Sequence, residues 1–536
     1  MRQTSPPKMA EPLLLVVSVI LAAMGAIIGI QLITSLGISA NTSILGALIA
    51  ICVSRIPIAA LSGFRDIHRQ NLVQTAVSAA TFGAANCLIT AIGIPWLMGM
   101  PELVWPMLLG AALAMLVDAT MMYKLFDSKI FPGKGVWPAG VATAEALWAG
   151  DQGGKKAIVL ALGIGGGVGG SALGIPMSAA GVAFIGNMVA LLAFALGLLV
   201  RGYANNHPFS EFIPDFDVNA LYIPHGFMIG AGLVAMIQVI RQILQARRKT
   251  GLVAEEKDVS ASYLDTVRAG FFAYLGVALL IALVAGLYHT MSWPMLVAFV
   301  LFAACAALVQ ETIVGIAAMY SGWFPAFAAA LISLILGMLL GFPPEALAML
   351  VGFCTATGPA FADKGFDLKT GFLIRGEGQD QQAELYGRRQ QYLIAMLGFC
   401  VAIVMVSLMY STYFEQGLVA PASRAYASTI QAGTSPEVAM QLLIWMVPGA
   451  LLQWAGGATR QLGVMFATGL LINYPIAGWT VLTALLIRWV LEKGFKSRVS
   501  DTSSFAGGLI AGDALFTAAN MFIPLLKAKV VALFTR

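Results

Sequence analysis

The chain has 536 residues, of which 59% are hydrophobic and only 11% are charged, and its mean hydropathy is +0.84. Soluble domains carry about 25% charged residues, so this composition excludes a water-soluble protein. The formal charge of +5 fits positively charged cytoplasmic loops, and no basic arm with interleaved aromatic residues indicates a nucleic-acid partner. Successive apolar runs of about 20 residues predict membrane-spanning helices, because a chain in lipid must satisfy its backbone hydrogen bonds internally.

The apolar runs of the first half predict crossings that begin and end on the cytoplasmic side. The first run is too long for a signal-peptide core, so we interpret it as an uncleaved helix with a cytoplasmic N-terminus. Arg65 and Arg69 place the loop 63–73 in the cytoplasm. The short stretch 135–150 could be re-entrant, but the charges of the loops around it agree only if it crosses. The predicted spans are 13–36, 41–62, 74–92, 105–123, 135–150, 156–174, 178–200 and 220–240.

The second half contains one apolar segment too many for a cytoplasmic C-terminus, so we interpret one of the later short segments as part of a hairpin. The resulting fold class is an all-α polytopic membrane protein with about 16 transmembrane helices, internal repeats and short or re-entrant segments. Charged cytoplasmic loops are predicted at 363–390 and 492–500. The predicted segments are 267–289, 293–309, 324–341, 345–362, 391–411, 438–455, 462–475, 477–491 and 504–524.

This pattern divides the chain into two transmembrane halves. The N-terminal half is predicted to span residues 1–245 and the C-terminal half residues 267–536, with about eight helices each. A basic cytoplasmic linker, residues 246–266, is predicted to join them, because it is rich in lysine and arginine.

Two carboxylates stand inside apolar runs of similar sequence. Glu145 lies within Gly140–Trp148, and Asp513 takes the same place within Gly508–Phe516, which keeps the glycine, an Ala-Leu pair and an aromatic residue. Ionisable groups in membrane spans are costly and mark function by default, and a proton-coupled carrier needs a carboxylate that gains and loses a proton. Glu145 and Asp513 are therefore the predicted proton-coupling residues. The alternative is that each pairs with an arginine or a helix N-terminus and stabilises the fold.

The similarity between Gly140–Trp148 and Gly508–Phe516 also predicts an internal repeat, with the binding site where the repeats meet.

Polar residues at the edges of apolar runs are candidate substrate contacts. Asn71, Gln74 and Thr75 lead into the predicted span 74–92, where amides at i and i+3 share one helix face. Such amides can hydrogen-bond a peptide-like backbone or cap a neighbouring helix. Glu311 lies in a polar break between two apolar runs, where it either lines a pathway or faces the cytoplasm. Asp118, deep in an apolar run, is predicted to pair with a nearby residue such as Lys124 rather than to carry protons.

Other classes of site find no support in the sequence. The run Gly163–Ser171 contains a formal G-x-G-x-x-G, but no strand precedes it, so close helix packing through Gly165 and Gly169 is predicted instead. The cysteines and histidines show no ligand spacing, so neither a metal site nor a cofactor is predicted. No nucleotide-binding loop or catalytic constellation occurs, which argues against an ATPase and against an intramembrane enzyme. Energy must then come from an ion gradient or from the gradient of the substrate.

Four stretches together resemble the oligopeptide transporter (OPT) superfamily, which includes the yellow-stripe-like metal-chelate carriers. They are Asn71–Thr75, Phe131–Glu145, Asp367–Gly371 and Gly507–Asp513. The residues alone indicate an ordinary solvated loop around Asp363 to Lys369, but the resemblance implies that Asp367 and Lys369 contact substrate. The chain departs from the family pattern at Glu311–Gly315, where many relatives have an Asn-Pro-x-Ser-Gly-like break, and this leaves the substrate subclass open.

The resemblance implies a fold of about 16 helices and import of small peptides or metal–chelator complexes, coupled to protons. We expect a prokaryotic member in the bacterial inner membrane, surrounded by lipid and with a homodimer as one possible assembly. Small oligopeptides are the expected cargo, carried by alternating access. The alternatives are a metal–chelate carrier and a gradient-driven facilitator or channel of the same fold.

Overall fold

All named elements in the described part of the chain are helices. The computed structural model shows nine candidate spans there that are long and apolar enough to cross a membrane, with four shorter apolar helices beside them. This finding confirms the all-α, multi-pass class, while the total of about 16 helices stays a prediction. The described residues are 6–37, 42–55, 58–128, 130–151, 155–204, 217–218, 220–249, 261–321, 326–433, 436–494, 505–513, 516–517 and 520.

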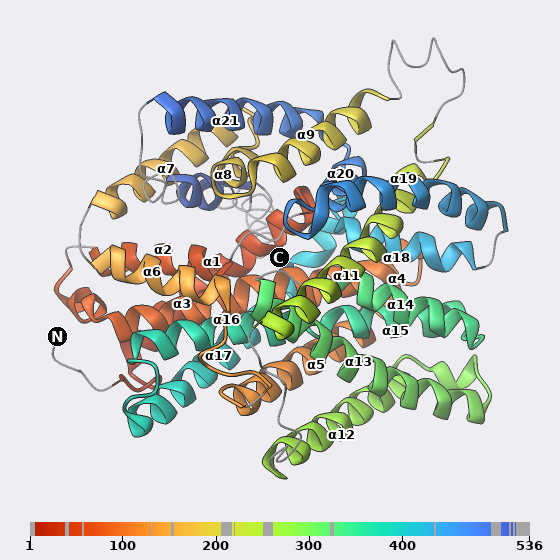
Figure 1. Cartoon of the computed structure of the whole chain (residues 1–536), viewed down its shortest axis with the longest axis horizontal. Coiled ribbons are helices and arrows are strands. Elements are labelled where there is room, and N and C mark those ends of the chain that lie inside the picture. The colour runs from red at the N-terminus through yellow and green to blue at the C-terminus, as the bar shows by residue number, and fades with distance from the viewer. Residues whose placement is uncertain are drawn as a thin grey trace, which may run out of the picture.

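The helices follow the order of the apolar runs (Figure 1). In the first half they are α1 (Pro12–Ser35), α2 (Thr42–Arg55), α3 (Ile67–Phe82), α4 (Thr90–Leu97), α5 (Val104–Leu125), α6 (Pro138–Asp151), α7 (Lys155–Ala172), α8 (Met177–Ile185), α9 (Met188–Tyr203) and α11 (Ile223–Lys249). In the second half they are α12 (Ala261–Val284), α13 (Trp293–Ser321), α14 (Ala326–Leu339), α15 (Pro344–Ala356), α16 (Pro359–Ile374), α17 (Gln381–Glu415), α18 (Pro421–Ala432), α19 (Pro436–Arg460), α20 (Leu462–Leu470) and α21 (Pro475–Gly494). Residues 505–513 are also helical.

Several predicted boundaries are wrong where polar residues interrupt an apolar run. The predicted span 178–200 is two helices, because Asn187 caps α9 by accepting hydrogen bonds from the backbone N–H groups of Val189 and Ala190. The predicted polar break after residue 309 is the interior of α13. Helix α18 was not predicted at all. Residues 250–260 of the predicted linker and 495–500 of the predicted loop 492–500 lie outside the described residues.

The prediction of a charged cytoplasmic loop at 363–390 is also wrong. Residues 359–374 form α16, whose side chains are buried almost throughout, and α17 already begins at Gln381. Hydropathy cannot detect such a helix, because its charged residues find partners inside the protein instead of in water. This helix positions the polar network described below.

Two long spans, residues 67–97 and 344–374, form the centre of the molecule. Each has 31 residues, and 94% of its most apolar window is buried. α3 packs beside α16, and α4 packs beside α15, so the two spans run antiparallel. Both are irregular in the middle. The first contains a π-helical segment, Gly83–Ile89, and the second is broken at Gly358, whose φ of 97° favours glycine.

The spacing of these elements supports an internal repeat. The second central span begins 277 residues after the first (67 and 344), and the helices that follow them, α5 and α17, begin at 104 and 381, again 277 apart. α5 packs on α15 and α17 packs on α3, so the two antiparallel units make corresponding contacts. This register differs from the predicted match of Gly140–Trp148 with Gly508–Phe516, which are 368 residues apart.

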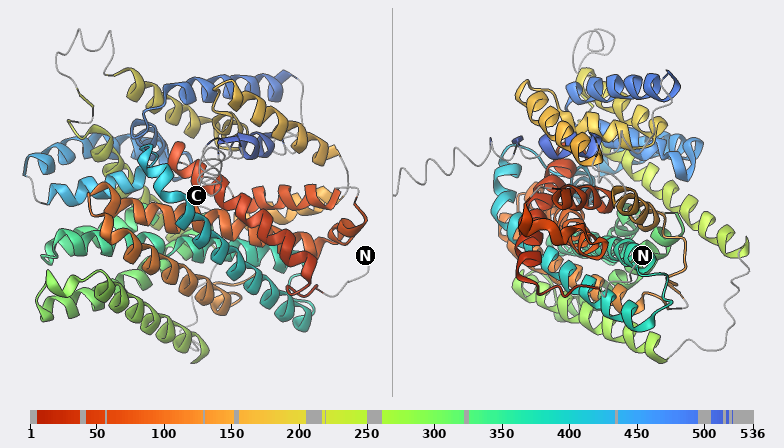
Figure 2. Two further views of the ribbon diagram at one scale, coloured as in Figure 1. Left: turned by 180° about the vertical axis from the view of Figure 1, so that it is seen from behind. Right: turned by 90° about the vertical axis from the view of Figure 1, so that its left-hand side faces the viewer.

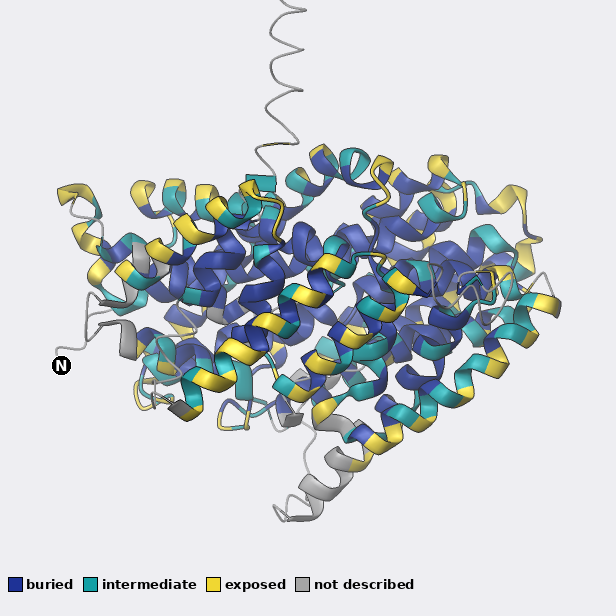
Figure 3. Ribbon diagram, turned by 90° about the horizontal axis from the view of Figure 1, so that it is seen from above, coloured by how far each residue is buried: buried dark blue, intermediate teal, exposed yellow. Residues whose placement is uncertain are grey.

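The helices form a larger body and a smaller layer beside it (Figures 1 and 2). The body contains α1–α5 and α12–α17, and the layer contains α7–α9 with α19–α21. Both therefore mix the two sequence halves, so the division at residues 246–266 stays a prediction. Figure 3 shows buried residues in the interior and exposed residues around the rim. Large apolar side chains such as Leu162, Leu408 and Trp454 are exposed, which suits contact with lipid.

Glycines allow close helix crossings in the smaller layer. A Cβ atom on Gly163 or Gly167 of α7 would lie 2.3 Å from the Phe505 carbonyl oxygen or 2.5 Å from that of Leu509. The small-residue crossing is therefore present, but it uses Gly163 and Gly167. The predicted pair, Gly165 and Gly169, is wrong, because no described atom lies within 4 Å of a Cβ built at either position.

Candidate functional site

A buried polar network joins α16 to α3. Gln74 Nε2 donates a hydrogen bond to Asp367 Oδ1 over 2.7 Å, and Ser78 Oγ donates to Asp363 Oδ1 over 2.9 Å. All four residues are buried. Neutral donors directed at carboxylates offset the cost of removing these charges from water. The two central spans are thus held together by polar contacts as well as by apolar packing.

Helix α17 completes this network through Gln391. Its side-chain amide donates to Asp367 O over 2.8 Å and to Thr75 Oγ1 over 3.2 Å, and it lies 3.4 Å from Asn71 Oδ1. The ammonium of Lys364 donates to the backbone oxygen of Gln391 over 2.9 Å. One glutamine side chain therefore connects three helices, α3, α16 and α17.

The loop before α6 joins the same network. Lys369 Nζ donates to Gly133 O over 2.9 Å, and Thr370 Oγ1 donates to Gly140 O over 3.0 Å. A Cβ atom on Gly140 would lie 2.6 Å from the Phe366 backbone oxygen, so only glycine allows α6 to approach so closely. Three of the four stretches that carry the family resemblance thus meet at one place.

The network accounts for five predicted substrate residues, which are Asn71, Gln74, Thr75, Asp367 and Lys369. All five are buried, and they lie together. In this conformation none of them lines the large cavity described next. Their role as substrate contacts stays a prediction.

Glu311 belongs to a second buried cluster. It lies inside α13, where it accepts a hydrogen bond from the Tyr274 hydroxyl of α12. The same hydroxyl lies 2.5 Å from Asp118 Oδ1 of α5. Asp118 thus pairs with Tyr274, and also with the backbone N–H of Gly358, instead of with Lys124 as predicted.

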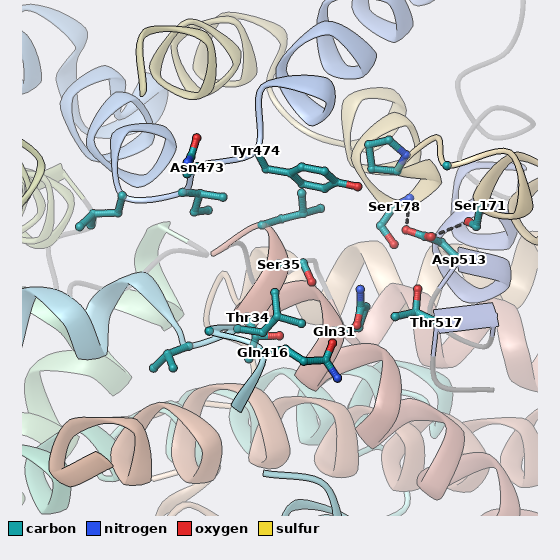
Figure 4. Close-up of a pocket in the computed structure, with 18 of the residues that line it drawn as sticks. Gln31, Thr34, Ser35, Ser171, Ser178, Gln416, Asn473, Tyr474, Asp513 and Thr517 are labelled. Carbon is teal, nitrogen blue, oxygen red and sulfur yellow. Dashed lines mark hydrogen bonds between the residues drawn. The ribbon is translucent and has the colours of Figure 1, made fainter. Parts of the chain in front are cut away.

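A cavity of about 920 Å³ lies between the body and the smaller layer (Figure 4). It is formed by the end of α1, the α7–α8 connection, α9, α11, the α17–α18 connection, the α20–α21 connection and the chain beyond residue 512. Ligand pockets in proteins commonly measure about 300–1,000 Å³, so a small organic molecule fits here. Its polar lining consists of Gln31, Thr34, Ser35, Ser171, Ser178, Arg201, His225, Gln416, Arg424, Asn473, Tyr474, Asp513, Thr517 and Asn520.

Asp513 provides the negative charge of this lining. One carboxylate oxygen accepts a hydrogen bond from Ser171 Oγ over 2.5 Å, and the other accepts from the Ser178 backbone N–H over 2.8 Å. Figure 4 shows these bonds at one side of the cavity, near Thr517. The N-terminal turn of α8 contributes the Ser178 N–H group, as helix N-termini do for anions. This carboxylate is therefore held by neutral groups.

The two arginines of the lining, Arg201 and Arg424, lie near each other, and Arg201 also interacts with Asp217. Arg201 and Arg424 are close enough to interact electrostatically with each other and with His225, whereas Asp513 acts on Tyr413 and Tyr474. His225 Nδ1 is buried and has no hydrogen-bond partner among the described residues. The cavity therefore presents a cationic group with spare hydrogen-bonding capacity and a separate carboxylate.

Sequence reasoning found only one of the charged cavity residues, Asp513. Arg201 and Arg424 lie between predicted spans, in segments that we interpreted as loops. Nothing in the neighbouring sequence identified either residue as part of a binding site. Glu145 is exposed on α6 and is not part of the cavity lining, so its role in proton coupling stays a prediction.

The comparisons with known proteins agree with the resemblance noted in the sequence. The family described as OPT oligopeptide transporter protein matches residues 13–238 and 215–523, which together cover nearly the whole chain. No curated protein matches the chain. With its many apolar spans, the chain is a multi-pass membrane protein and a transporter rather than an enzyme, and it belongs to the OPT oligopeptide transporter family.

Proposed function

We propose that the protein imports small oligopeptides by alternating access and that protons drive the uptake. The observation that carries this proposal is the charge pattern of the cavity between the two layers. A free peptide has an ammonium group at one end and a carboxylate at the other. Asp513 can bind the ammonium group, and the cluster of Arg201, His225 and Arg424 can bind the carboxylate. Such charge-assisted hydrogen bonds are strong in partly buried sites.

Neutral polar residues suit the rest of such a substrate. Gln31, Gln416 and Asn473 line the cavity, and amides can both donate to and accept from a peptide backbone. They do not distinguish one side chain from another, so we expect broad selectivity for sequence. Length and free termini would then decide which peptides bind.

Alternating access fits the way the cavity is built. Its walls come from the body and from the smaller layer, so rocking one against the other would change the side to which the cavity opens. The network around Asp367 and Gln74 is buried in this conformation. Contact between these residues and substrate, as the family resemblance implies, would require the network to open in another state.

We propose two carboxylates from the sequence as coupling residues, Asp513 and Glu145. Asp513 is the better placed of the two, because it lies where substrate would bind and protonation would weaken its hold on an ammonium group. We also retain the bacterial inner membrane and a cytoplasmic N-terminus as proposals, which rest on the positive charges of the loops.

A metal–chelate complex is the second candidate cargo. Many chelators carry several carboxylates and amines, and the same cavity offers partners for both. A gradient-driven facilitator of the same fold is the third candidate. It would bind the same substrates but would not accumulate them.

The test is competition binding to the purified protein with peptides whose termini are free or blocked. Acetylation of the N-terminus should weaken binding to the wild type by about tenfold or more, and amidation of the C-terminus should do the same. In Asp513→Asn, acetylation should no longer matter, while amidation still should. In Arg424→Gln, amidation should matter less.

Asp265→Asn is the matched control, because it also removes a carboxylate but 73% of its side chain is exposed. It should bind free and blocked peptides like the wild type. Equal affinity of the wild type for free and blocked peptides would refute the cavity assignment. Binding of an iron–chelator complex without binding of any peptide would move the protein to the metal-chelate branch.

A further inference from the structure

We propose that Asp118, Tyr274 and Glu311 form a further group that binds a coupled proton, in addition to the proposed coupling residues. They come from three helices, α5, α12 and α13, and they meet inside the larger body. Asp118 and Tyr274 are fully buried, and Glu311 is 1% exposed. None of the three lines the substrate cavity. The proposal rests on the proposed proton coupling, and it replaces neither Asp513 nor the cavity.

The two hydrogen bonds of this cluster require one more proton than the Tyr274 hydroxyl supplies. Tyr274 has a single hydroxyl hydrogen, yet its oxygen is within hydrogen-bond distance of one carboxyl oxygen of Asp118 and one of Glu311. An ionised carboxylate can only accept hydrogen bonds. One of the two contacts must therefore be donated by a protonated carboxyl group. We therefore assign the observed arrangement to the proton-loaded state.

In the described part of the chain, the cluster has no positively charged partner. Among the described residues, no ion pair includes Asp118 or Glu311. The titratable groups that interact with Asp118 are Glu311, Tyr274 and Cys87 of the π-helical segment, and none of them is a cation. Two ionised carboxylates this close together in a dry site would repel each other strongly.

Asp118 also contacts the break between α15 and α16. Its second carboxyl oxygen accepts a hydrogen bond from the Gly358 backbone N–H over 2.5 Å. Gly358 precedes the first turn of α16, and the same helix carries Asp363 and Asp367 to α3. A change in charge at Asp118 would thus act directly on the helix that forms the central polar network.

These contacts give a mechanism for coupling. When the proton leaves to water, Tyr274 can donate to only one of the two carboxylates, and the other must separate from it. Separation of Glu311 from Tyr274 would move α13 relative to α12, and a shift of Asp118 would loosen its contact with Gly358 at the start of α16. Reloading the proton restores the observed arrangement. Proton binding would therefore favour one facing of the transporter, as a coupling site must.

The experiment compares coupled uptake with exchange in proteoliposomes containing the wild type or Glu311→Gln. Exchange of labelled peptide across the membrane needs no net proton movement, whereas accumulation under an inward proton gradient does. Glu311→Gln should keep exchange but should neither accumulate peptide nor carry protons with it, as followed by a pH-sensitive dye inside the vesicles. Tyr274→Phe removes the bridging hydroxyl and should also weaken coupling.

Tyr426→Phe is the matched control, because it removes a buried hydroxyl that donates to the neutral backbone oxygen of Phe327. It should remain fully coupled. Infrared spectra give a readout that does not require transport. The carbonyl stretch of a protonated carboxyl group should be present at neutral pH in the wild type and in Tyr426→Phe, and it should be lost in Glu311→Gln.

The possible failures can be distinguished. If Glu311→Gln accumulates peptide like the wild type, or if its infrared band is unchanged, the assignment of Asp118, Tyr274 and Glu311 is overturned. The proposed proton coupling of the transporter would not be affected. A wild type that exchanges peptide but neither accumulates it under an inward proton gradient nor carries protons with it would overturn the proposed coupling itself, and this assignment with it. Accumulation driven by a sodium gradient in place of a proton gradient would likewise overturn both.

Discussion

Removal of the Glu384 carboxylate tests whether the buried charges of α16 and α17 hold the central network together. Glu384 accepts two hydrogen bonds from Arg375, of 2.7 Å and 3.1 Å, and one from Arg388, of 3.1 Å. The side chains of Glu384 and Arg375 are each 3% exposed, and that of Arg388 is 9% exposed. Glu384→Gln keeps the shape of the residue but removes the charge that both guanidinium groups face.

The expected loss of stability follows from this burial. In the variant, Arg388 keeps Asp127 at 3.6 Å, but Arg375 keeps only neutral acceptors. These are the Gln391 side-chain oxygen at 2.7 Å and the amide oxygen that replaces the carboxylate at position 384. Breaking a buried ion pair in this way costs about 3–5 kcal/mol, because the remaining charge is left without compensation. Gln391 also connects α3 to α16, so the damage should extend into the polar network.

Glu492→Gln is a control with the same chemistry at the surface. Glu492 pairs with Arg488 at i, i+4 over 2.8 Å, as Glu384 pairs with Arg388, but 34% of its side chain is exposed. Such a pair contributes only about 0.3–0.5 kcal/mol. Unfolding of purified protein in mixed micelles, followed by tryptophan fluorescence, measures both free energies. Equal losses in the two variants, or a loss below about 1 kcal/mol in Glu384→Gln, would refute the reasoning.

Three further predictions concern packing, coupling and capping. Gly167→Ala should sharply lower the yield of folded protein, because its Cβ would lie 2.5 Å from the Leu509 backbone oxygen, while Gly165→Ala should not, as gel filtration can check. Glu145→Gln should accumulate peptide less under a proton gradient, and uphill uptake with normal proton dependence would remove Glu145 from the coupling residues. Asn187→Ala removes the cap of α9 and should destabilise the protein by about 1 kcal/mol in unfolding measurements; no change would show that the cap contributes nothing.

Uninterrupted apolar runs were predicted well from the sequence. The first span was predicted at 13–36 and is observed as Pro12–Ser35, because no charged residue and no internal proline divides the run. Apolar periodicity failed where charges are buried. Around Asp363 and Lys369 it indicated a solvated loop, because their partners, Ser78 and Gly133, lie in distant segments of the chain, which a local pattern cannot show. Only the family resemblance identified Asp367 and Lys369 as important.

The cavity and the proton cluster could not be predicted for a related reason. The cavity lining comes from segments as distant as Gln31 and Asp513, and no local pattern joins them. Asp118 and Glu311 were each noticed in the sequence, but separately. Tyr274, which connects them, had no feature that distinguished it from other tyrosines in apolar runs. Spatial convergence of residues far apart in sequence is the information that the structure adds.

The most direct test of the account is uptake of a labelled tripeptide into proteoliposomes under an imposed inward proton gradient. The account predicts that the internal concentration rises above the external one and that a protonophore collapses this difference. Asp513→Asn should lose most of the uptake, while Asp265→Asn should retain it. Two results with folded protein would contradict this prediction. One is that the internal peptide concentration only reaches the external one, and the other is that no peptide is taken up.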